Sequence, residues 1–245
     1  MSAARKQASR AAPAKKRPRT YHHGDLRRAL VEETVRLIEV QDVGAVSLRE
    51  VARRLGVTYA APYHHFQDKG ALLAAVAEDG FRALLGAVQE GLRGSGAAAP
   101  ASLLAAAGRA YIQFATTHQA HYRTMFLPEF RERERFASLH EAGGQALDAL
   151  VSLVSAARPH DSISDARALA VACWSSWHGF AMLTNNGVLS SHPDLRAADT
   201  LLSGLLSFVE HAVRAALAAP AAPLAHPQAE SGGARPRRSR SRGDS

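Results

Sequence analysis

The sequence has only one cysteine, Cys173, and no apolar run long enough to cross a bilayer. A single thiol cannot form an intramolecular disulfide, and this suits a reducing cytoplasm. A membrane-spanning helix would need about 18 consecutive apolar residues. Residues 20–219 also lack the alternation of apolar and polar residues that is typical of strands. These absences point away from a disulfide-stabilised or membrane-spanning protein, and they predict an all-α fold.

The 245 residues are 47% hydrophobic, which is enough for one or two packed domains. The whole chain carries +8 and its two tails, residues 1–19 and 220–245, together carry +10, so residues 20–219 carry −2. The tails are rich in Ala, Pro, Ser, Gly and Arg, and we expect both to be disordered. Their charge favours binding to a polyanion, and the alternative is that they only keep the chain in solution.

Between the tails, segments with helical periodicity are separated by Gly, Pro, Ser and Asp. The predicted helices are residues 25–41, 47–55, 58–64, 69–92, 101–118, 119–127, 136–157, 163–187 and 195–218. A Gly-Ser-Gly sequence followed by Pro100 marks a joint after the fourth helix. The predicted organisation is a disordered basic arm at 1–20, a DNA-binding unit at 21–80, a helical bundle at 81–219 and a disordered basic tail at 220–245.

Residues 47–66, SLREVARRLGVTYAAPYHHF, have the pattern of a helix-turn-helix. Ser47 and Glu50 have the spacing of a capping box, in which each side chain accepts the backbone N–H of the other residue. Gly56 suits the turn, and Ala52 is small where the second helix would cross. The remaining inward-facing positions are Val51, Leu55 and Val57. This geometry places the second helix toward a DNA major groove, although similar helix pairs also occur in proteins that do not bind DNA.

The sequence after the second helix adds a family resemblance. Residues 63–73, YHHFQDKGALL, together with the helix at 25–41, resemble the DNA-binding domain of the TetR (tetracycline-repressor-like) family over about residues 22–80. The tripeptide Trp177, His178 and Gly179 resembles the ligand-binding domain of a subfamily named for its Trp-His-Gly motif. The resemblance implies a homodimer, a recognition helix in the major groove, and usually a small-molecule effector that weakens DNA binding.

The resemblance also implies roles for individual residues. The first residues of the recognition helix meet bases, whereas the Tyr and His before Phe66 and the Lys that opens the next helix contact phosphate. The hydroxyl of Ser47, at a helix N-terminus, can reach another phosphate. The expected DNA-binding residues are therefore Ser47, Thr58, Tyr59, Ala60, Tyr63, His64, His65 and Lys69. Phe66 is expected in the core.

Pro62 departs from the family pattern, which commonly has Leu there. If Thr58 caps the recognition helix, Pro62 is its fourth residue, where an N–H should first bond back to the capping carbonyl. Proline has no N–H and its ring crowds that carbonyl, so we expect a weakened first turn or a later start.

The helices at 163–187 and 195–218 are apolar over more of their surface than one neighbour can cover. We therefore expect them to pair with a second copy in a four-helix dimer interface, the alternative being a fully intramolecular core. Aromatic, His and Met side chains on two segments are predicted to line a ligand pocket, or else to fill the core. These residues are Tyr111, Phe114, His118, Tyr122, Met125, Phe126, Trp174, Trp177, His178 and Met182.

Two other patterns are weaker. His118 and His121 lie one helical turn apart, as metal ligands can, but no further ligand is in register, so no metal site is expected. Cys173 and His178 lie on different faces of one helix, so no catalytic pair is expected.

The sequence thus predicts a cytoplasmic, nucleoid-associated regulator that is neither an enzyme nor dependent on a cofactor. It is expected to bind a palindromic operator in double-stranded DNA as a repressing homodimer and to be released by a small molecule. The alternatives are a nonspecific nucleoid-type protein that binds DNA through its basic arms, or an all-α carrier or enzyme for a small molecule.

The basic arms generate a first prediction. Residues 21–69 contain seven basic and seven acidic side chains, so the DNA-binding unit is neutral. Each phosphate contact adds about −0.9 to the slope of log affinity against log salt. Deleting residues 1–19 should flatten this slope and lower the affinity for random DNA, while operator choice survives. Deleting residues 220–245 should change less. Binding measured across a salt series tests this, and an unchanged slope without residues 1–19 would contradict it.

Overall fold

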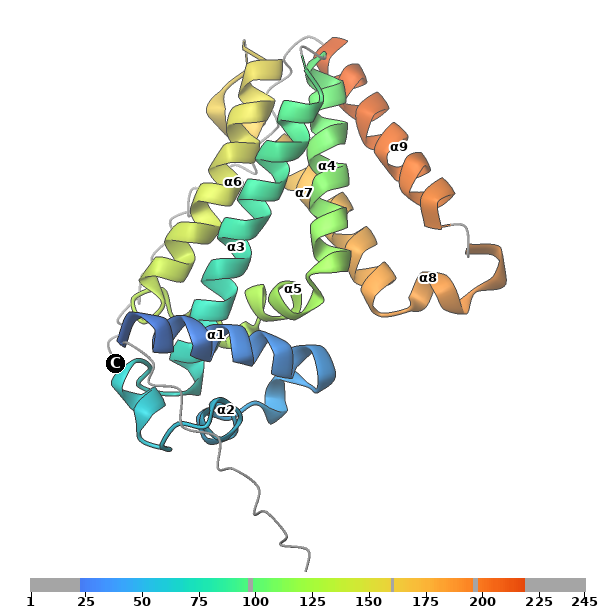
Figure 1. The fold of residues 1–245 in the computed structure, drawn as a ribbon. Coiled ribbons are helices and arrows are strands. Elements are labelled where there is room, and N and C mark those ends of the chain that lie inside the picture. The colour runs from blue at the N-terminus through green and yellow to red at the C-terminus, as the bar shows by residue number, and fades with distance from the viewer. Residues whose placement is uncertain (1–22, 97–98, 160, 196–197, 219–245) are drawn as a thin grey trace, which may run out of the picture.

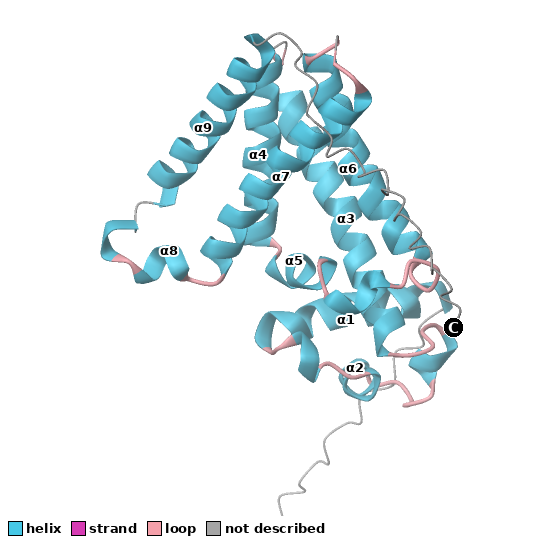
Figure 2. Ribbon diagram, turned by 180° about the vertical axis from the view of Figure 1, so that it is seen from behind, coloured by secondary structure: helices cyan, strands magenta, loops and turns pink. Residues whose placement is uncertain are grey.

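The computed structural model describes residues 23–96, 99–159, 161–195 and 198–218, and in these ranges it contains helices and no strand (Figures 1 and 2). The α-helices are α1 (His23–Val40), α2 (Leu48–Leu55), α3 (Lys69–Gly94), α4 (Pro100–Thr117), α5 (Gln119–Met125), α6 (Ala137–Ala157), α7 (Ile163–Asn185), α8 (Val188–Ser191) and α9 (Ala198–Ala218). The 3-10 helices are η1 (Val43–Ala45), η2 (Ala61–His64), η3 (Pro128–Arg131) and η4 (Pro193–Leu195). The predicted all-α class is confirmed. The predicted arm at 1–20 and tail at 220–245 lie outside the described residues.

Helices α1, α2 and η2 form a small unit at one end of the molecule (Figure 1). Helices α3, α4, α6 and α7 pack side by side above it, and α9 packs mainly on α4. Helix α5 lies between the two parts, where it contacts both α1 and α3. No helix in the described ranges is long and apolar enough to cross a membrane.

The small unit has its own core, because α1 buries the apolar face that its sequence periodicity predicts. Leu30, Leu37 and Ile38 are fully buried, and the buried Thr34 hydroxyl donates to the Leu30 carbonyl at 2.7 Å. This hydrogen bond removes the cost of burying a hydroxyl without a partner. Glu33 connects α1 to α2 through an ion pair with Arg54, whose guanidinium nitrogen lies 3.6 Å from the Glu33 carboxylate.

Helix α3 belongs to both parts of the molecule. Residues 72–77 in its first turns are all buried, and the helix contacts α1 and α5 as well as α4 and α6 of the bundle. The same helix then continues to Gly94 alongside α4 and α6. The boundary that the sequence suggests at residues 80 and 81 therefore falls inside one continuous helix.

Candidate functional site

Helix α2 begins and ends as its sequence predicts. The Ser47 hydroxyl accepts the Glu50 N–H at 3.2 Å, and Gly56 ends the helix with φ of 69°, a conformation that costs little only for glycine. The capping box is only half formed, however. The Glu50 carboxylate does not return to the Ser47 N–H, because Arg53 and Arg54 on the same helix donate to it at 2.7 to 3.1 Å.

The second helix of the motif differs from the prediction of a helix over 58–64 capped by Thr58. It is the shorter 3-10 helix η2, which starts after Ala60. The Ala61 N–H donates to the Thr58 carbonyl at 3.0 Å, so that carbonyl is satisfied without residue 62. Pro62 is buried in the first turn of η2, where an N–H has no partner within the helix. Pro62 is therefore compatible with a helix that starts after Ala60 and has 3-10 geometry, and its missing N–H removes no hydrogen bond within that helix.

Most of the predicted DNA-binding side chains are exposed in the structure. Thr58, Ala60 and His64 are exposed, and the rings of Tyr59 and Tyr63 are 58% and 52% exposed although both are large and partly apolar. Exposed tyrosines on a short helix are available for contact with a partner. Phe66 is buried, as predicted.

The other three predicted residues are partly engaged within the chain. Ser47 caps α2, and His65 is half-buried. The Lys69 ammonium donates to the Gly44 carbonyl at 2.6 Å and so ties the start of α3 to the turn between α1 and α2. An ammonium has three donors, so this bond leaves Lys69 able to make a further contact.

Ion pairs within α2 reduce the positive charge of the unit. Hydrogen bonds from Arg53 and Arg54 lower the pKa of Glu50 to about 2, so its carboxylate is charged at neutral pH. Together with the equal numbers of basic and acidic side chains in residues 21–69, this leaves the unit without a net positive charge at neutral pH.

The bundle contains a cavity of about 840 Å³ among α3, α4, α5, α6 and α7. Its size is typical of small-molecule sites, which range over about 300–1,000 Å³. Most of the lining is apolar and comes from α3 and α6. The residues that α3 contributes are Phe81, Leu84, Leu85, Val88, Gln89 and Leu92, and those of α6 include Leu139, Leu147, Leu150 and Leu153.

Five of the ten predicted pocket residues line this cavity: Tyr111, Met125, Phe126, Trp174 and Trp177. Tyr122 and His178 lie directly behind Tyr111. The other three, Phe114, His118 and Met182, lie elsewhere. Phe114 is in the core and its ring stacks on that of His118, whereas Met182 is 41% exposed on α7. Within the described residues, no group of three His, Cys, Asp or Glu side chains is placed to hold a metal ion.

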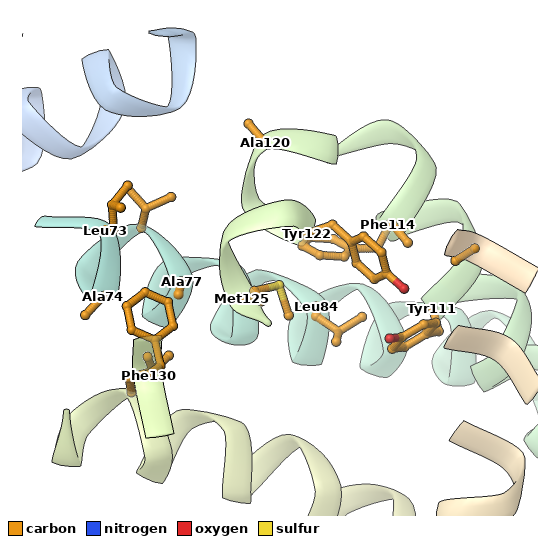
Figure 3. Close-up of a cluster of buried hydrophobic side chains, with 14 of the residues drawn as sticks. Leu73, Ala74, Ala77, Leu84, Tyr111, Phe114, Ala120, Tyr122, Met125 and Phe130 are labelled. Atoms are coloured by element: carbon orange, nitrogen blue, oxygen red, sulfur yellow. The ribbon is translucent and has the colours of Figure 1, made fainter. Parts of the chain in front are cut away.

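A hydrogen-bonded cluster joins the polar groups at this end of the cavity. The hydroxyls of Tyr111 and Tyr122 lie 2.9 and 2.8 Å from His178 Nδ1, and Figure 3 shows the two hydroxyls turned toward each other. Burial raises the pKa of both tyrosines, so their hydroxyls keep their protons and can donate. The Trp174 indole N–H donates to the Tyr111 hydroxyl at 3.1 Å. The two hydroxyls, the imidazole and the indole therefore form one hydrogen-bonded cluster.

The Trp-His-Gly tripeptide has an additional partner on α4. A Cβ on Gly108 would lie 2.4 Å from Nε1 of Trp177, so only glycine allows the indole to take this position. Trp177 is buried there and lines the cavity with its ring.

Sequence reasoning missed the α3 and α6 sides of the cavity. Both helices carry apolar residues around much of their circumference, and this pattern is the signal that an additional face is used. The glycine pair at 143 and 144 is a second signal, since both glycines line the cavity.

The loop between α5 and α6 connects the cavity to the helix-turn-helix unit. Leu127, Phe130 and Arg131 in this loop line the cavity. Arg135 at its end donates to the Asp68 carboxylate at 2.8 Å, and Asp68 caps α3 by accepting the Ala71 N–H at 2.9 Å.

Several solved structures share this fold. A protein described as of unknown function from Rhodococcus sp. RHA1 is 30% identical, covers 79% of this chain and 98% of its own, and has a TM-score of 0.65. AibR, solved in complex with isovaleryl coenzyme A and operator DNA, is 22% identical over 74% of this chain and 96% of its own, with a TM-score of 0.57. The fatty acid degradation regulator FadR from Bacillus halodurans is 14% identical over 82% and 99%, with a TM-score of 0.58. No curated protein matches the chain.

An exposed helix-turn-helix joined to a helical bundle with a ligand-sized cavity defines a DNA-binding transcription regulator. Residues 30–76 match the bacterial regulatory proteins of the tetR family, and residues 104–206 match the tetracyclin repressor-like C-terminal domain. The chain belongs to the TetR family.

The buried cluster generates a pH prediction. Burial lowers the pKa of His178 below that of an exposed histidine, so below about pH 6.5 the unfolded chain binds a proton that the folded chain does not. The free energy of unfolding should therefore decrease as the pH falls from 7.5 to 5.5.

The decrease should be smaller in His178→Gln, which keeps an acceptor but does not titrate. Urea unfolding at both pH values measures it, with the exposed His192→Gln as the matched control. An equal decrease in His178→Gln and the unmutated chain would contradict this assignment.

Proposed function

We propose that this chain is a repressor that binds a palindromic operator as a homodimer and leaves it when a small molecule occupies the cavity. The observation that carries the proposal is the shared helix α3. Its first residue, Lys69, follows the exposed surface of η2, and its second half lines the cavity. A ligand that shifts this half also shifts the helix on which the DNA-binding unit packs.

The exposed surface supports a division of roles at the DNA. Thr58, Tyr59 and Ala60 precede η2 and are the candidates for base contacts. Tyr63 and His64 lie on η2 and are the candidates for phosphate contacts, with Ser47, His65 and Lys69 at the edge of the same surface. Since the unit is neutral, these placed contacts and the helix termini must supply the affinity that a cationic face would otherwise give.

A protein with this fold is known to combine both ligands, because AibR was solved with isovaleryl coenzyme A and operator DNA together. This supports the same combination here. The chain then acts by binding rather than by catalysis, in the cytoplasm and on the nucleoid.

Helices α7 and α9 support a dimer. Each buries part of its apolar surface within the chain, as Trp177 and Leu206 show. Each also leaves large apolar side chains exposed, which is unusual away from interfaces. These are Val171, Met182 and Leu183 on α7 and Phe208 on α9, the last being 67% exposed. A second copy that contributes the same two helices would cover them.

The central experiment selects bound sites from random duplex DNA. A specific dimer should enrich two inverted half-sites about 34 Å apart or a multiple of that distance, which is the repeat of the DNA helix. Binding without any enriched sequence would indicate the nonspecific nucleoid-type protein instead. No DNA binding at all would favour a carrier or an enzyme.

Tyr63 tests the phosphate contacts. Tyr63→Phe removes one hydroxyl from an exposed ring and should lower the affinity for operator and random DNA alike, by about tenfold or more, as expected for one hydrogen bond to a charged acceptor. The matched variant Tyr59→Phe should change the ranking of operator sequences. Fluorescence anisotropy with a set of operator variants measures both. A changed base preference in Tyr63→Phe would assign that hydroxyl to a base.

Phe208 tests the dimer. Phe208→Asp places a charge in the proposed interface, so the chain should become monomeric and lose most of its operator affinity, because the two half-sites are bound together. The control is Val40→Asp, at a side chain that is 73% exposed on α1. Analytical ultracentrifugation at micromolar concentration gives the oligomeric state. An unmutated chain that sediments as a monomer would contradict the dimer.

A further inference from the structure

We propose that the cavity binds an anionic amphiphile with a long unbranched apolar body, such as a medium-chain or long-chain carboxylate, whose charged end lies at Arg131 and Arg133. This inference rests on the proposed function, since it assigns a ligand class to the same cavity. It is carried by the shape of the cavity, its apolar lining, the satisfied hydroxyl and imidazole groups at its inner end and the charge at its edge.

The cavity is elongated. Its lining follows α3 from Phe81 to Leu92 and α6 from Leu139 to Leu153. At 1.5 Å per residue these spans are about 16 Å and about 21 Å long. A space of this length between two packed helices fits an extended chain better than a compact ring system.

The walls along this length are mostly apolar. Their polar side chains are Gln89 on α3 and His140 and Asp148 on α6, and the last two already have partners, the Phe130 carbonyl and Arg167. Leu84, Leu85 and Val88 on α3 are faced by Leu147 and by other leucines on α6. A ligand gains affinity here by burying methylene groups, and each one is worth about fourfold in the binding constant.

The polar groups at the Tyr111 end do not call for a polar ligand atom. The Tyr111 hydroxyl already accepts from Trp174 and lies within hydrogen-bond distance of His178 Nδ1. Tyr122 lies at a similar distance from the same nitrogen. The Trp177 indole N–H has no hydrogen-bond partner among the described residues, and it packs against Gly108 on α4. Because the hydroxyl and imidazole groups satisfy one another, the apolar end of a ligand that lies against them breaks none of their hydrogen bonds.

The charge of the lining selects an anion. Arg131, Arg133 and Arg167 line the cavity, and Asp148 is the only acidic side chain among the lining residues. Arg167 is paired with Asp148 at 3.3 Å. Arg131 and Arg133 are exposed, so they lie where the cavity meets solvent.

Neither of these two arginines is neutralised by an ion pair within the described residues. The ion pairs of their loop are those of Arg135, with Asp68 and Glu132. Two unpaired guanidinium groups at the edge of an apolar cavity match a carboxylate, which they can bind with paired hydrogen bonds, and they disfavour an ammonium.

The experiment titrates the full chain with octanoate, decanoate and dodecanoate below their micellar concentrations. Both tryptophans of the chain line the cavity, so intrinsic fluorescence reports occupancy, and calorimetry confirms the stoichiometry. Affinity should rise by about fifteenfold for each two added carbons. The alcohol and the alkylammonium of each length should bind at least tenfold more weakly than the carboxylate.

The double variant Arg131→Gln, Arg133→Gln tests the charged end. It should lower carboxylate affinity at least tenfold and leave the affinity for the alcohol of the same length within twofold. The matched control is Arg109→Gln with Arg123→Gln, at two exposed arginines outside the cavity lining. Because all four side chains are exposed, these changes should not affect folding.

Equal or tighter binding of the alkylammonium, or unchanged carboxylate affinity in the double variant, would overturn the proposed ligand class. Selection of operator sites in parallel separates this inference from the function on which it rests. If the chain selects an operator but binds no carboxylate, the ligand class is wrong and the regulator stands. If it binds carboxylates with the expected dependence on length and charge but selects no DNA sequence, the proposed function is wrong and the ligand class stands.

Discussion

The structure depends on one helix, α3, that packs in two different environments along its length. Its first turns are buried, the helix contacts α1 and α5 as well as α4 and α6, and its later turns form a wall of the cavity. No proline interrupts its 26 residues, which extend over about 39 Å. A helix without such a break is stiff, so it does not absorb a displacement of its cavity side. The α5–α6 loop adds a second connection, because it lines the cavity and holds Asp68 through Arg135.

Among the described residues, several basic side chains are paired in the helix-turn-helix unit and two are unpaired at the edge of the cavity. The helix-turn-helix unit has no net charge, and Arg53 and Arg54 are paired with Glu50 within α2. The cavity edge shows the opposite arrangement, because Arg131 and Arg133 have no acidic partner in the described part of the chain. The helix-turn-helix unit therefore offers DNA a small number of placed side chains rather than an excess of positive charge.

The local elements of the fold are predictable from the sequence because their causes are local. Ser47 and Gly56 delimit α2 through hydrogen bonds and backbone geometry that involve neighbouring residues alone. Of the two effects expected of Pro62, a weakened first turn or a later start, η2 shows the later start, whereas its 3-10 form was not predicted. The cavity was predicted only in part, because its α3 and α6 walls come from contacts between distant segments, and periodicity shows that a face is apolar without showing what it faces.

The close approach of Trp177 to Gly108 has a consequence for the evolution of this protein. A methyl group at position 108 has no room while the indole is in place, so the first mutation away from glycine would have to displace the ring that closes this side of the cavity. A smaller residue at position 177 would instead leave room for that methyl group. The two positions, 69 residues apart in the sequence, are therefore coupled by their packing, which joins α7 to α4 at the wall of the cavity.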